Sequence, residues 1–244
     1  MNDIIRSLHS RKSVRVYEDR EISSSVKREI LLAAMAAPSA GNQQLYTILD
    51  IMDQAIKDRL AVTCDNQPFI AKAPMVLIFL ADCQKWYDAY EAYSCNPRLP
   101  GVGDLLLAVS DCCIAAQNAV TAAESFGIGS CYIGDVMEHC EEHRELLCLP
   151  PYVFPAAMVV FGYPTAQQKA RKKPERCELK DIVHENTYHR IDPAAFRELF
   201  KKHSGAQEFK EWINAFCARK YNSDFAKEMT RSMAEYLKQF QTTL

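Results

Sequence analysis

The residues best suited to chemistry lie near the N-terminus, in the basic segment Arg11-Lys12-Ser13-Val14-Arg15-Val16-Tyr17. Side chains alternate faces along an extended chain, so Arg11, Ser13 and Arg15 share one face. A guanidinium group can donate to two phosphate oxygens at once, and the hydroxyl supplies another donor. The spacing therefore indicates a phosphate site. The alternative is a solvated basic turn, which is the usual meaning of an isolated run of charges.

A phosphate would have to be held by side chains, because the common backbone phosphate loops are missing from the sequence. No Gly-x-Gly-x-x-Gly follows a strand pattern, and no Gly-x-x-x-x-Gly-Lys-Ser/Thr occurs. The first motif is typical of dinucleotide-binding folds and the second of nucleoside triphosphatases. A Gly-x-Ser-x-Gly turn is also missing, so the sequence does not support an α/β-hydrolase.

Three further segments could complete such a site. Pro38–Gln44 is rich in small residues and side-chain amides, which suit the edge of a heteroaromatic ring. Gly127–Asp135 places glycines around a short strand, which lets the backbone approach a planar ligand. Lys172–Arg176 is a second cationic patch. The respective alternatives are a plain turn, a helix end followed by a tight strand end, and a solvated loop.

His139, Cys140 and His143 are candidate metal ligands, since two histidines four residues apart on a helix can bind one ion. Charged residues surround them: Glu138, Glu141, Glu142, Arg144 and Glu145. That surrounding is typical of a solvated helix face, and no third ligand accompanies the pair. We therefore predict no metal site.

Composition limits the class of protein. The 244 residues are 48% hydrophobic and 25% charged, enough for one large domain or a domain with an appendage. The net charge of −2 provides no basic field for nucleic acid. Ten cysteines without a Cys-x-x-Cys argue against a disulfide framework and an iron–sulfur cluster. No apolar run is long enough to cross a bilayer, and the N-terminus does not resemble a secretory leader, so we expect a cytoplasmic protein with no membrane partner.

Helical and strand patterns alternate along the chain, which predicts an α+β fold with helices on the faces of a sheet. The expected helices cover residues 25–36, 54–62, 103–126 and 135–148, and the expected strands 47–52, 75–81, 130–133 and 156–162. The helix over 103–126 is apolar on most faces, so we expect burial on nearly all sides. Residues 84–101 form either a mobile aromatic lid or a helical excursion. Residues 193–240 should form two or three amphipathic helices.

Together these segments resemble the flavin-dependent nitroreductase family. That family has an Arg-x-Ser-x-Arg-x-aromatic start, a Pro-Ser-x-x-Asn-x-Gln loop, a Gly-x-Gly-x-x-x-Ile-Gly strand and a late Lys-Pro-x-Arg patch. The matching segments here are residues 11–17, 38–44, 127–134 and 173–176. Asn66-Gln67 ahead of residues 70–74, together with 115–119 and 183–188, is similar to the oxygen-insensitive NADPH nitroreductases and NADPH–flavin oxidoreductases. The resemblance covers about the first 190 residues.

The resemblance implies an α+β sandwich with a central, mostly antiparallel sheet flanked by helices. Two copies would form an intertwined homodimer, with FMN at the interface and residues from both chains around it. Residues 1–190 would form the FMN-binding core. Residues 191–244 would form a C-terminal helical extension that packs on the dimer.

The resemblance also implies which residues bind FMN. The phosphate and ribityl chain would be held by Arg11, Lys12, Ser13 and Arg15 from one side and by Lys173 and Arg176 from the other. The flavin ring would meet Gln67 at its edge, the backbone of Tyr132, Ile133 and Gly134, and Ser39, Asn42 and Gln44 of the partner subunit. Many relatives have Lys-Pro-Arg, whereas Glu175 intervenes here, so Lys172 is the alternative to Lys173.

The implied chemistry belongs to the flavin. NADPH or NADH would pass hydride to flavin N5, and a nitroaromatic, quinone or flavin acceptor would then take two electrons at the same site in ping-pong order. No protein residue would be a catalytic acid, base or nucleophile. Arg219 and Lys220 are the candidates for the 2′-phosphate of NADPH. The alternatives are reductive dehalogenation or flavin destruction on the same fold, and a flavin-binding carrier or sensor without turnover.

Trp86, Tyr87 and Tyr90 form an aromatic cluster in the 84–101 segment. The cluster either shapes a substrate pocket or packs as an ordinary helix face.

Overall fold

The computed structural model describes residues 1–205 and 207–241. They form two compact units. One contains Met1–Lys173 and the chain from Met229 onward, and the other contains Pro174–Glu228. This division differs from the expected domain boundary at residue 190, and packing of the C-terminal helices on a dimer stays a prediction.

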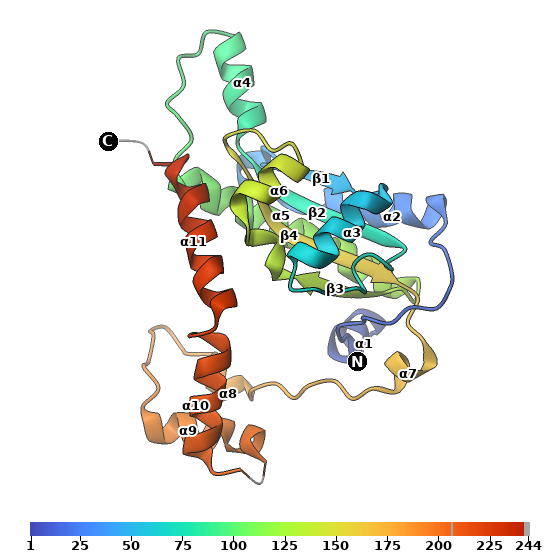
Figure 1. The fold of residues 1–244 in the computed structure, drawn as a ribbon, viewed down its shortest axis with the longest axis vertical. Helices are drawn as coiled ribbons and strands as arrows, with labels where there is room; N and C mark the ends of the chain where they lie inside the picture. Colours follow the sequence, from blue (N-terminus) through green and yellow to red (C-terminus); the bar gives the residue numbers. More distant parts are fainter. Residues whose placement is uncertain (206, 242–244) are drawn as a thin grey trace. The chain divides into compact units, whose positions relative to one another are not determined.

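The first unit is built on a four-stranded antiparallel sheet in the order β1-β2-β4-β3 (Figure 1). The strands are β1 (Tyr46–Asp50), β2 (Met75–Asp82), β3 (Gly129–Ile133) and β4 (Val153–Gly162). The central strands β2 and β4 are buried along their whole length, which explains their unbroken apolar sequences. The expected α+β class and all four strands are confirmed.

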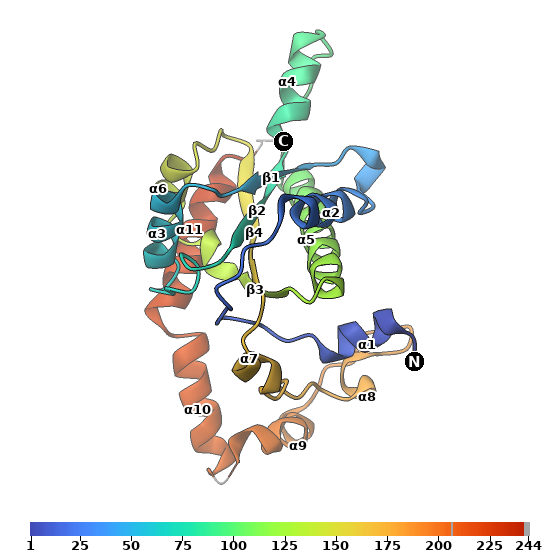
Figure 2. The same ribbon diagram turned by 90° about the vertical axis from the view of Figure 1, so that its right-hand side faces the viewer.

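Helices cover both faces of this sheet. Helices α2 (Ser24–Met35) and α5 (Val102–Ser125) lie on one side, and α3 (Gln54–Thr63) lies on the other, as Figure 2 shows. Alternate side chains of β2 pack on the two sides of the sheet. Leu77 and Phe79 belong to the core cluster with α2 and α5, whereas Val76 and Ile78 belong to the cluster with α3. Successive side chains of a strand point to opposite faces, so one strand supplies both cores.

Helix α5 is less buried than its composition suggested. One side packs into the core, but Leu106, Leu107 and Ile114 are 62%, 51% and 40% exposed. The expectation of burial on nearly all sides was wrong for a single chain, because the sheet covers only one side of the helix. Among the described residues, α5 alone is long and apolar enough to cross a membrane, yet buried residues such as Ala108 and Ala115 pack it into the core. The described residues leave the apolar outer side of α5 exposed.

Residues 84–101 contain helix α4 (Gln84–Ala92) followed by an irregular connection to α5. The rings of Trp86 and Tyr90 lie 5.5 Å apart on α4, between ring centroids. Trp86 is half-buried and packs against the main core, but together with Tyr87 and Tyr90 it also lines a pocket of about 410 Å³, so the cluster combines a packed helix face with the wall of a pocket.

Three helices follow residue 193, within the expected range: α9 (Pro193–Ser204), α10 (Phe209–Lys220) and α11 (Asp224–Lys238). Rings on α9 and α10 form a continuous series of contacts in the second unit, in which His203 lies 6.3 Å from Trp212 and Trp212 lies 5.4 Å from Phe216. Short helices complete the chain: α1 (Asp3–Ser10), α6 (Cys140–Leu146), α7 (Ala166–Ala170) and α8 (Leu179–Ile182).

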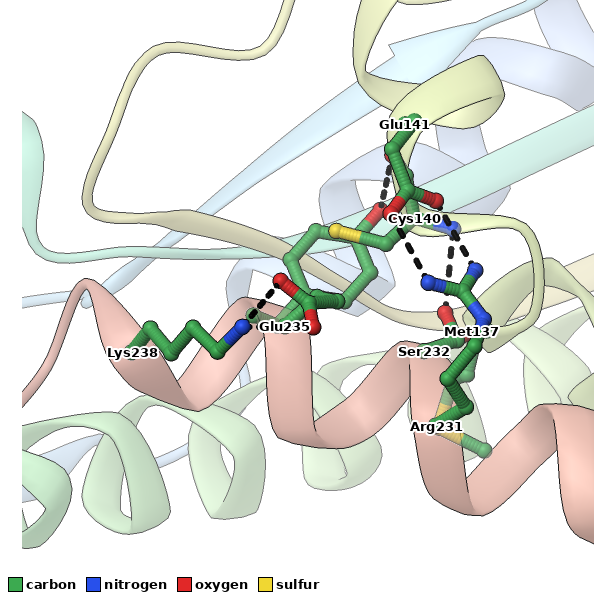
Figure 3. A network of polar contacts seen from close by, with 8 residues as sticks. Met137, Cys140, Glu141, Arg231, Ser232, Glu235 and Lys238 are labelled. Carbon is green, nitrogen blue, oxygen red and sulfur yellow. Dashed lines mark hydrogen bonds and ion pairs between the residues drawn. The ribbon is translucent and has the colours of Figure 1, made fainter.

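The helix expected over 135–148 is interrupted. A 3₁₀ turn, η2 (Gly134–Met137), is followed by α6, and His139 between them has a left-handed φ of 50°. Helix α11 supports this break (Figure 3). The Ser232 hydroxyl accepts from the Cys140 N–H at 3.0 Å and donates to the Met137 carbonyl at 2.7 Å. Helix starts carry N–H groups without partners, and Ser232 supplies the acceptor from another helix.

Candidate cofactor-binding site

The basic strand, residues 11–17, lies beside β3. Ser13 pairs with Ser130 in a parallel bridge, and the Val14 N–H donates to the Ser130 carbonyl at 2.9 Å. Gly129 makes this approach possible, because a Cβ there would lie 2.5 Å from Cγ2 of Val14. Two segments singled out from the sequence, 11–17 and 127–134, are therefore in direct contact.

Beside this contact is a pocket of about 290 Å³, here called the basic pocket. Its lining includes Arg11, Lys12, Glu124, Gly127 and Gln168. The Arg11 Nε atom is buried and has no hydrogen-bond partner within the described part of the chain, and the same is true of the Ser130 hydroxyl. Buried donors are nearly always satisfied in folded proteins, so an unpaired guanidinium nitrogen points to an absent anionic ligand. The donor set fits a phosphate.

The basic run over residues 169–176, here called the late basic segment, begins beside this region. Lys12 Nζ donates to the carbonyl of Lys169 at 2.6 Å and to that of Arg171. Lys173 Nζ donates to the carbonyl of His9 at 2.7 Å, at the end of α1. Residues 169–173 thus lie beside the basic strand, with both lysine ammonium groups bound to backbone carbonyls, and the expected phosphate contacts of Lys173 and Arg176 stay a prediction. Arg176 lies in the second unit, where its guanidinium donates to the Pro174 carbonyl at 3.3 Å.

Arg15 does not line the basic pocket. Its guanidinium lies over the Phe69 ring, 5.7 Å from the centroid, and it borders a separate hollow with Tyr17 and Lys72. The side chains of Arg11 and Arg15 therefore border different hollows in the single chain, and their contact with one shared ligand stays a prediction. A stacking partner for Arg15 provides the physical reason, since cations are attracted to an aromatic face.

Gln168 and Glu124 are among the residues of the basic pocket that were missed from the sequence. Gln168 is buried, and its Oε1 accepts from the Arg15 N–H at 3.2 Å. Glu124 lies at the end of α5, where burial raises the pKa of its carboxyl while Arg11 and Lys12 pull that pKa down. Neither residue belongs to a recognisable motif, and only tertiary structure brings them to the pocket.

The expected ring-contacting residues occupy β3 and a tight turn. Tyr132 has its ring 5.9 Å from the Arg11 guanidinium carbon, and its hydroxyl donates to Gln117 at 3.4 Å. Desolvation raises the pKa of Tyr132 to about 12, so this phenol is neutral at physiological pH. Ile133 ends β3 and Gly134 begins η2. Gln67 donates through Nε2 to the Cys64 carbonyl at 2.8 Å, directly after the left-handed residue Asn66.

The loop over residues 39–44 has a defined conformation. It contains a short 3₁₀ turn, and Gly41, Asn42 and Gln44 have φ values of 56°, 56° and 51°. The Gln44 N–H donates to the Ser39 hydroxyl at 3.1 Å. Asn42 and Gln44 are exposed. Within the described residues, no hydrogen bond or ion pair joins this loop to Arg11, Lys12, Ser13 or Arg15 of the same chain.

His143 was wrongly placed on a solvated face. It is completely buried, with Nδ1 2.9 Å from the Val136 carbonyl and Nε2 2.8 Å from the Thr63 hydroxyl. The carbonyl can only accept, so Nδ1 carries the proton and Nε2 accepts from Thr63. Among the described residues, no group of three or more metal-binding side chains is present. Both ring nitrogens of His143 are occupied by structural hydrogen bonds.

The sequence and the fold were compared with known proteins. The model of the Nitroreductase family matches residues 8–163. The chain is 31% identical to FMN reductase [NAD(P)H] of Bacillus subtilis over 238 residues, covering 97% of this chain and 91% of that protein. It is 31% identical to an oxygen-insensitive NADPH nitroreductase of Salmonella typhimurium over 192 residues, covering 79% and 77% of the two chains. The structure of B. megaterium NfrA2 superposes with a TM-score of 0.83 at 28% identity, covering 99% of this chain and all of that one. With the basic strand, the glycine-flanked β3 and the sheet all in place, this chain belongs to the nitroreductase family.

Proposed function

We propose that this protein is an FMN-dependent NAD(P)H oxidoreductase that reduces nitroaromatic, quinone or flavin acceptors by two electrons. The observation that carries the proposal is the basic pocket, which Arg11 lines together with Gly129 of β3 and where the buried Arg11 Nε has no partner among the described residues. The names of the relatives, FMN reductase and NADPH nitroreductase, point to the same cofactor and donor.

The chain's own residues bind and orient the cofactor in this proposal. Arg11, Lys12, Ser13 and Arg15 hold the phosphate and ribityl chain, and Lys173 and Arg176 contribute charge from the late basic segment. Gln67 and the backbone of Tyr132, Ile133 and Gly134 contact the ring system. When bound, FMN supplies the redox chemistry, taking hydride from NAD(P)H and giving two electrons to the acceptor. No side chain is required as an acid, a base or a nucleophile.

We further propose a cytoplasmic homodimer in which Ser39, Asn42 and Gln44 of one subunit face the flavin of the other. The exposed apolar side of α5, with Leu106 and Leu107, supports the dimer, since large apolar patches on a folded chain commonly mark an interface. The same arrangement gives loop 39–44 a role that it lacks in the isolated chain, where it does not bind the basic strand.

The test begins with the purified protein. We expect yellow protein with the absorbance of oxidised flavin, and bleaching on addition of NADPH or NADH without oxygen. Colourless protein that takes up no added FMN would contradict the proposal. A flavin-binding carrier or sensor would retain FMN but show no steady-state NAD(P)H oxidation with menadione or nitrofurazone as acceptor. Anaerobic single-turnover rates with NADPH and NADH then identify the preferred donor.

A further inference from the structure

Asp111 lies inside the first unit, on the side of α5 that faces the core. It is only 3% exposed. Its Oδ1 accepts from the Ala40 N–H at 2.9 Å, and its Oδ2 accepts from the Leu45 N–H at 3.2 Å. The two carboxylate oxygens therefore bind one amide near the start of loop 39–44 and the amide directly after it, which lie 71 and 66 residues away in sequence.

The loop between those two amides has an unfavourable backbone. Asn42 and Gln44 are left-handed, although neither is glycine. Non-glycine residues in this region are disfavoured by about 1–2 kcal/mol each, so surrounding contacts must hold them there. Besides Asp111 and the loop's own backbone hydrogen bonds, two side chains contribute. The Ser39 hydroxyl accepts from Gln44 N–H at 3.1 Å, and the Trp86 indole N–H donates to the Gln43 carbonyl at 2.8 Å.

The chemistry of Asp111 suits this task. An ionised carboxylate in a protein interior is unfavourable unless its oxygens accept hydrogen bonds, and here each oxygen has a backbone donor. Hydrogen bonds to a charged acceptor are also about twice as strong as neutral ones. A serine or asparagine at this position could not accept from both amides with equal strength.

We infer that Asp111 is a positioning residue for flavin binding: its buried carboxylate holds loop 39–44 in the conformation that presents Asn42 and Gln44 to the cofactor. The inference rests on the proposed function, because it takes the loop to face the flavin. The loop then needs no rearrangement when the flavin binds. Preformed sites bind more tightly than flexible ones, since the loop's conformational entropy is lost at folding and not at binding.

The variant Asp111→Asn keeps the shape of the side chain but turns one acceptor into an NH₂ donor that opposes a backbone N–H. Asp111→Ser is a second variant that removes bulk and avoids this opposition. The matched control is Asn118→Ala on the same helix, because the Asn118 side chain donates to the Ala33 carbonyl of α2 at 3.2 Å and does not reach the loop. All variants are made in a Trp212→Phe background, which leaves Trp86 as the only one of the two tryptophans.

The first measurement is hydrogen exchange at the amides of Ala40 and Leu45 in the dimeric protein freed of FMN. In Asp111→Asn and Asp111→Ser we expect about tenfold faster exchange at these amides, the equivalent of about 1.4 kcal/mol, and unchanged exchange along α5. Trp86 fluorescence should shift toward that of a more solvated indole, since its partner Gln43 is in the loop. Unchanged exchange at both amides would overturn the inference.

The second measurement is FMN titration of the same proteins, followed by the visible circular dichroism of bound flavin. We expect FMN affinity to fall about tenfold in both Asp111 variants, with an altered dichroism spectrum, while Asn118→Ala matches the wild-type protein in both. Wild-type affinity and spectrum in the Asp111 variants would overturn the inference even if their stability falls. If wild-type protein itself binds no FMN, the proposed function fails and the flavin role of Asp111 fails with it, whereas amide exchange still decides whether Asp111 holds the loop.

Discussion

Arg11 is the residue on which the phosphate assignment depends most directly. Its buried Nε lacks a partner in the described chain, so a bound phosphate would satisfy it. Hydrogen bonds between charged groups contribute about 1.5–3 kcal/mol, so Arg11→Ala should weaken FMN binding by at least about tenfold. Titration calorimetry with the FMN-free protein measures this. Arg6→Ala is the matched control, because Arg6 is exposed on α1 and pairs with Asp3 at 3.0 Å. Equal losses in both variants would contradict a specific phosphate contact.

The titration of His143 should make the stability of the protein depend on pH. Burial lowers its pKa below the usual 6.5, so the unfolded chain binds a proton at a higher pH than the folded chain does. The free energy of unfolding must therefore fall as pH drops below about 6.5, by up to about 1.4 kcal/mol per pH unit until the folded protein also protonates. Urea denaturation between pH 8 and 5 checks this (the range is about 1.5 units either side of the ordinary His pKa).

A His143→Gln variant should be less stable at neutral pH and should show a shallower decline below it. His9→Gln provides the comparison, since His9 is exposed on α1. A decline as steep in His143→Gln as in the wild-type protein would show that other groups cause it.

At the scale of elements, the contacts between α11 and α6 should contribute unequally to the free energy of unfolding. Ser232 is completely buried and serves both Cys140 and Met137, so Ser232→Ala should destabilise the protein by about 1–3 kcal/mol. Arg231 and Glu141 form a bidentate ion pair with both N···O distances at 2.8 Å, but the two side chains are 45% and 64% exposed. Arg231→Ala should therefore change stability by less than about 1 kcal/mol. Thermal unfolding of the two variants distinguishes them, and a larger loss from Arg231→Ala would reverse this ranking.

The stabilising effect of the same ion pair should be lost at low pH. Arg231 lowers the pKa of Glu141 from 4.5 to about 2, but solvent screening of this exposed pair keeps its contribution to stability below about 1 kcal/mol. A carboxyl with a depressed folded-state pKa stabilises the fold above its unfolded pKa and loses that effect as pH falls toward the folded value. The difference in stability between the wild-type protein and Arg231→Ala should therefore be constant above about pH 5 and should shrink between about 4.5 and 2. Denaturation series at pH 7 and pH 3 measure that difference, and a constant difference would argue against the pair.

Elements with a local signal were predictable, and contacts between distant elements were not. The apolar runs of β2 and β4, and the helical patterns of α2 and α3, placed these elements to within a few residues. Three features depend on tertiary partners. The first is the break before α6, which Ser232 stabilises. The others are the buried hydrogen bond of His143 with Thr63 and the hydrogen bond of Asp111 to loop 39–44. The hydropathy of α5 also could not predict that one apolar side stays exposed, because hydropathy carries no information about which elements pack against a helix.

The same limits apply to the candidate site. The glycines around β3 and the cations of the basic strand stand out in the sequence, and the fold brings them together through Ser13 and Ser130. The separation of Arg11 from Arg15 follows from Phe69, far along the chain, which no local pattern includes. Gln168 and Glu124 are likewise recruited by the fold alone.

At the scale of the whole molecule, the exposed apolar side of α5 is the surface that a partner subunit would cover. Leu106 and Leu107 are exposed on its outer side, and a second copy of the chain would bury them. Leu107→Glu should therefore shift the protein from dimer to monomer, because a carboxylate buried at an apolar interface without a partner is strongly unfavourable. Sedimentation velocity at a fixed protein concentration measures the shift. The variant should also lose FMN, since the partner subunit would supply loop 39–44.

Val62→Glu is the control for that experiment. Val62 lies on α3, is 53% exposed, and belongs to the opposite side of the sheet, so the added charge should leave both dimer and FMN unaffected. Three outcomes are then informative about the molecule. A monomeric Leu107→Glu protein without FMN supports a shared site, whereas a monomer that retains FMN places the whole site within one chain. A Leu107→Glu protein that stays dimeric moves the interface away from α5 and with it the proposed role of Ser39, Asn42 and Gln44.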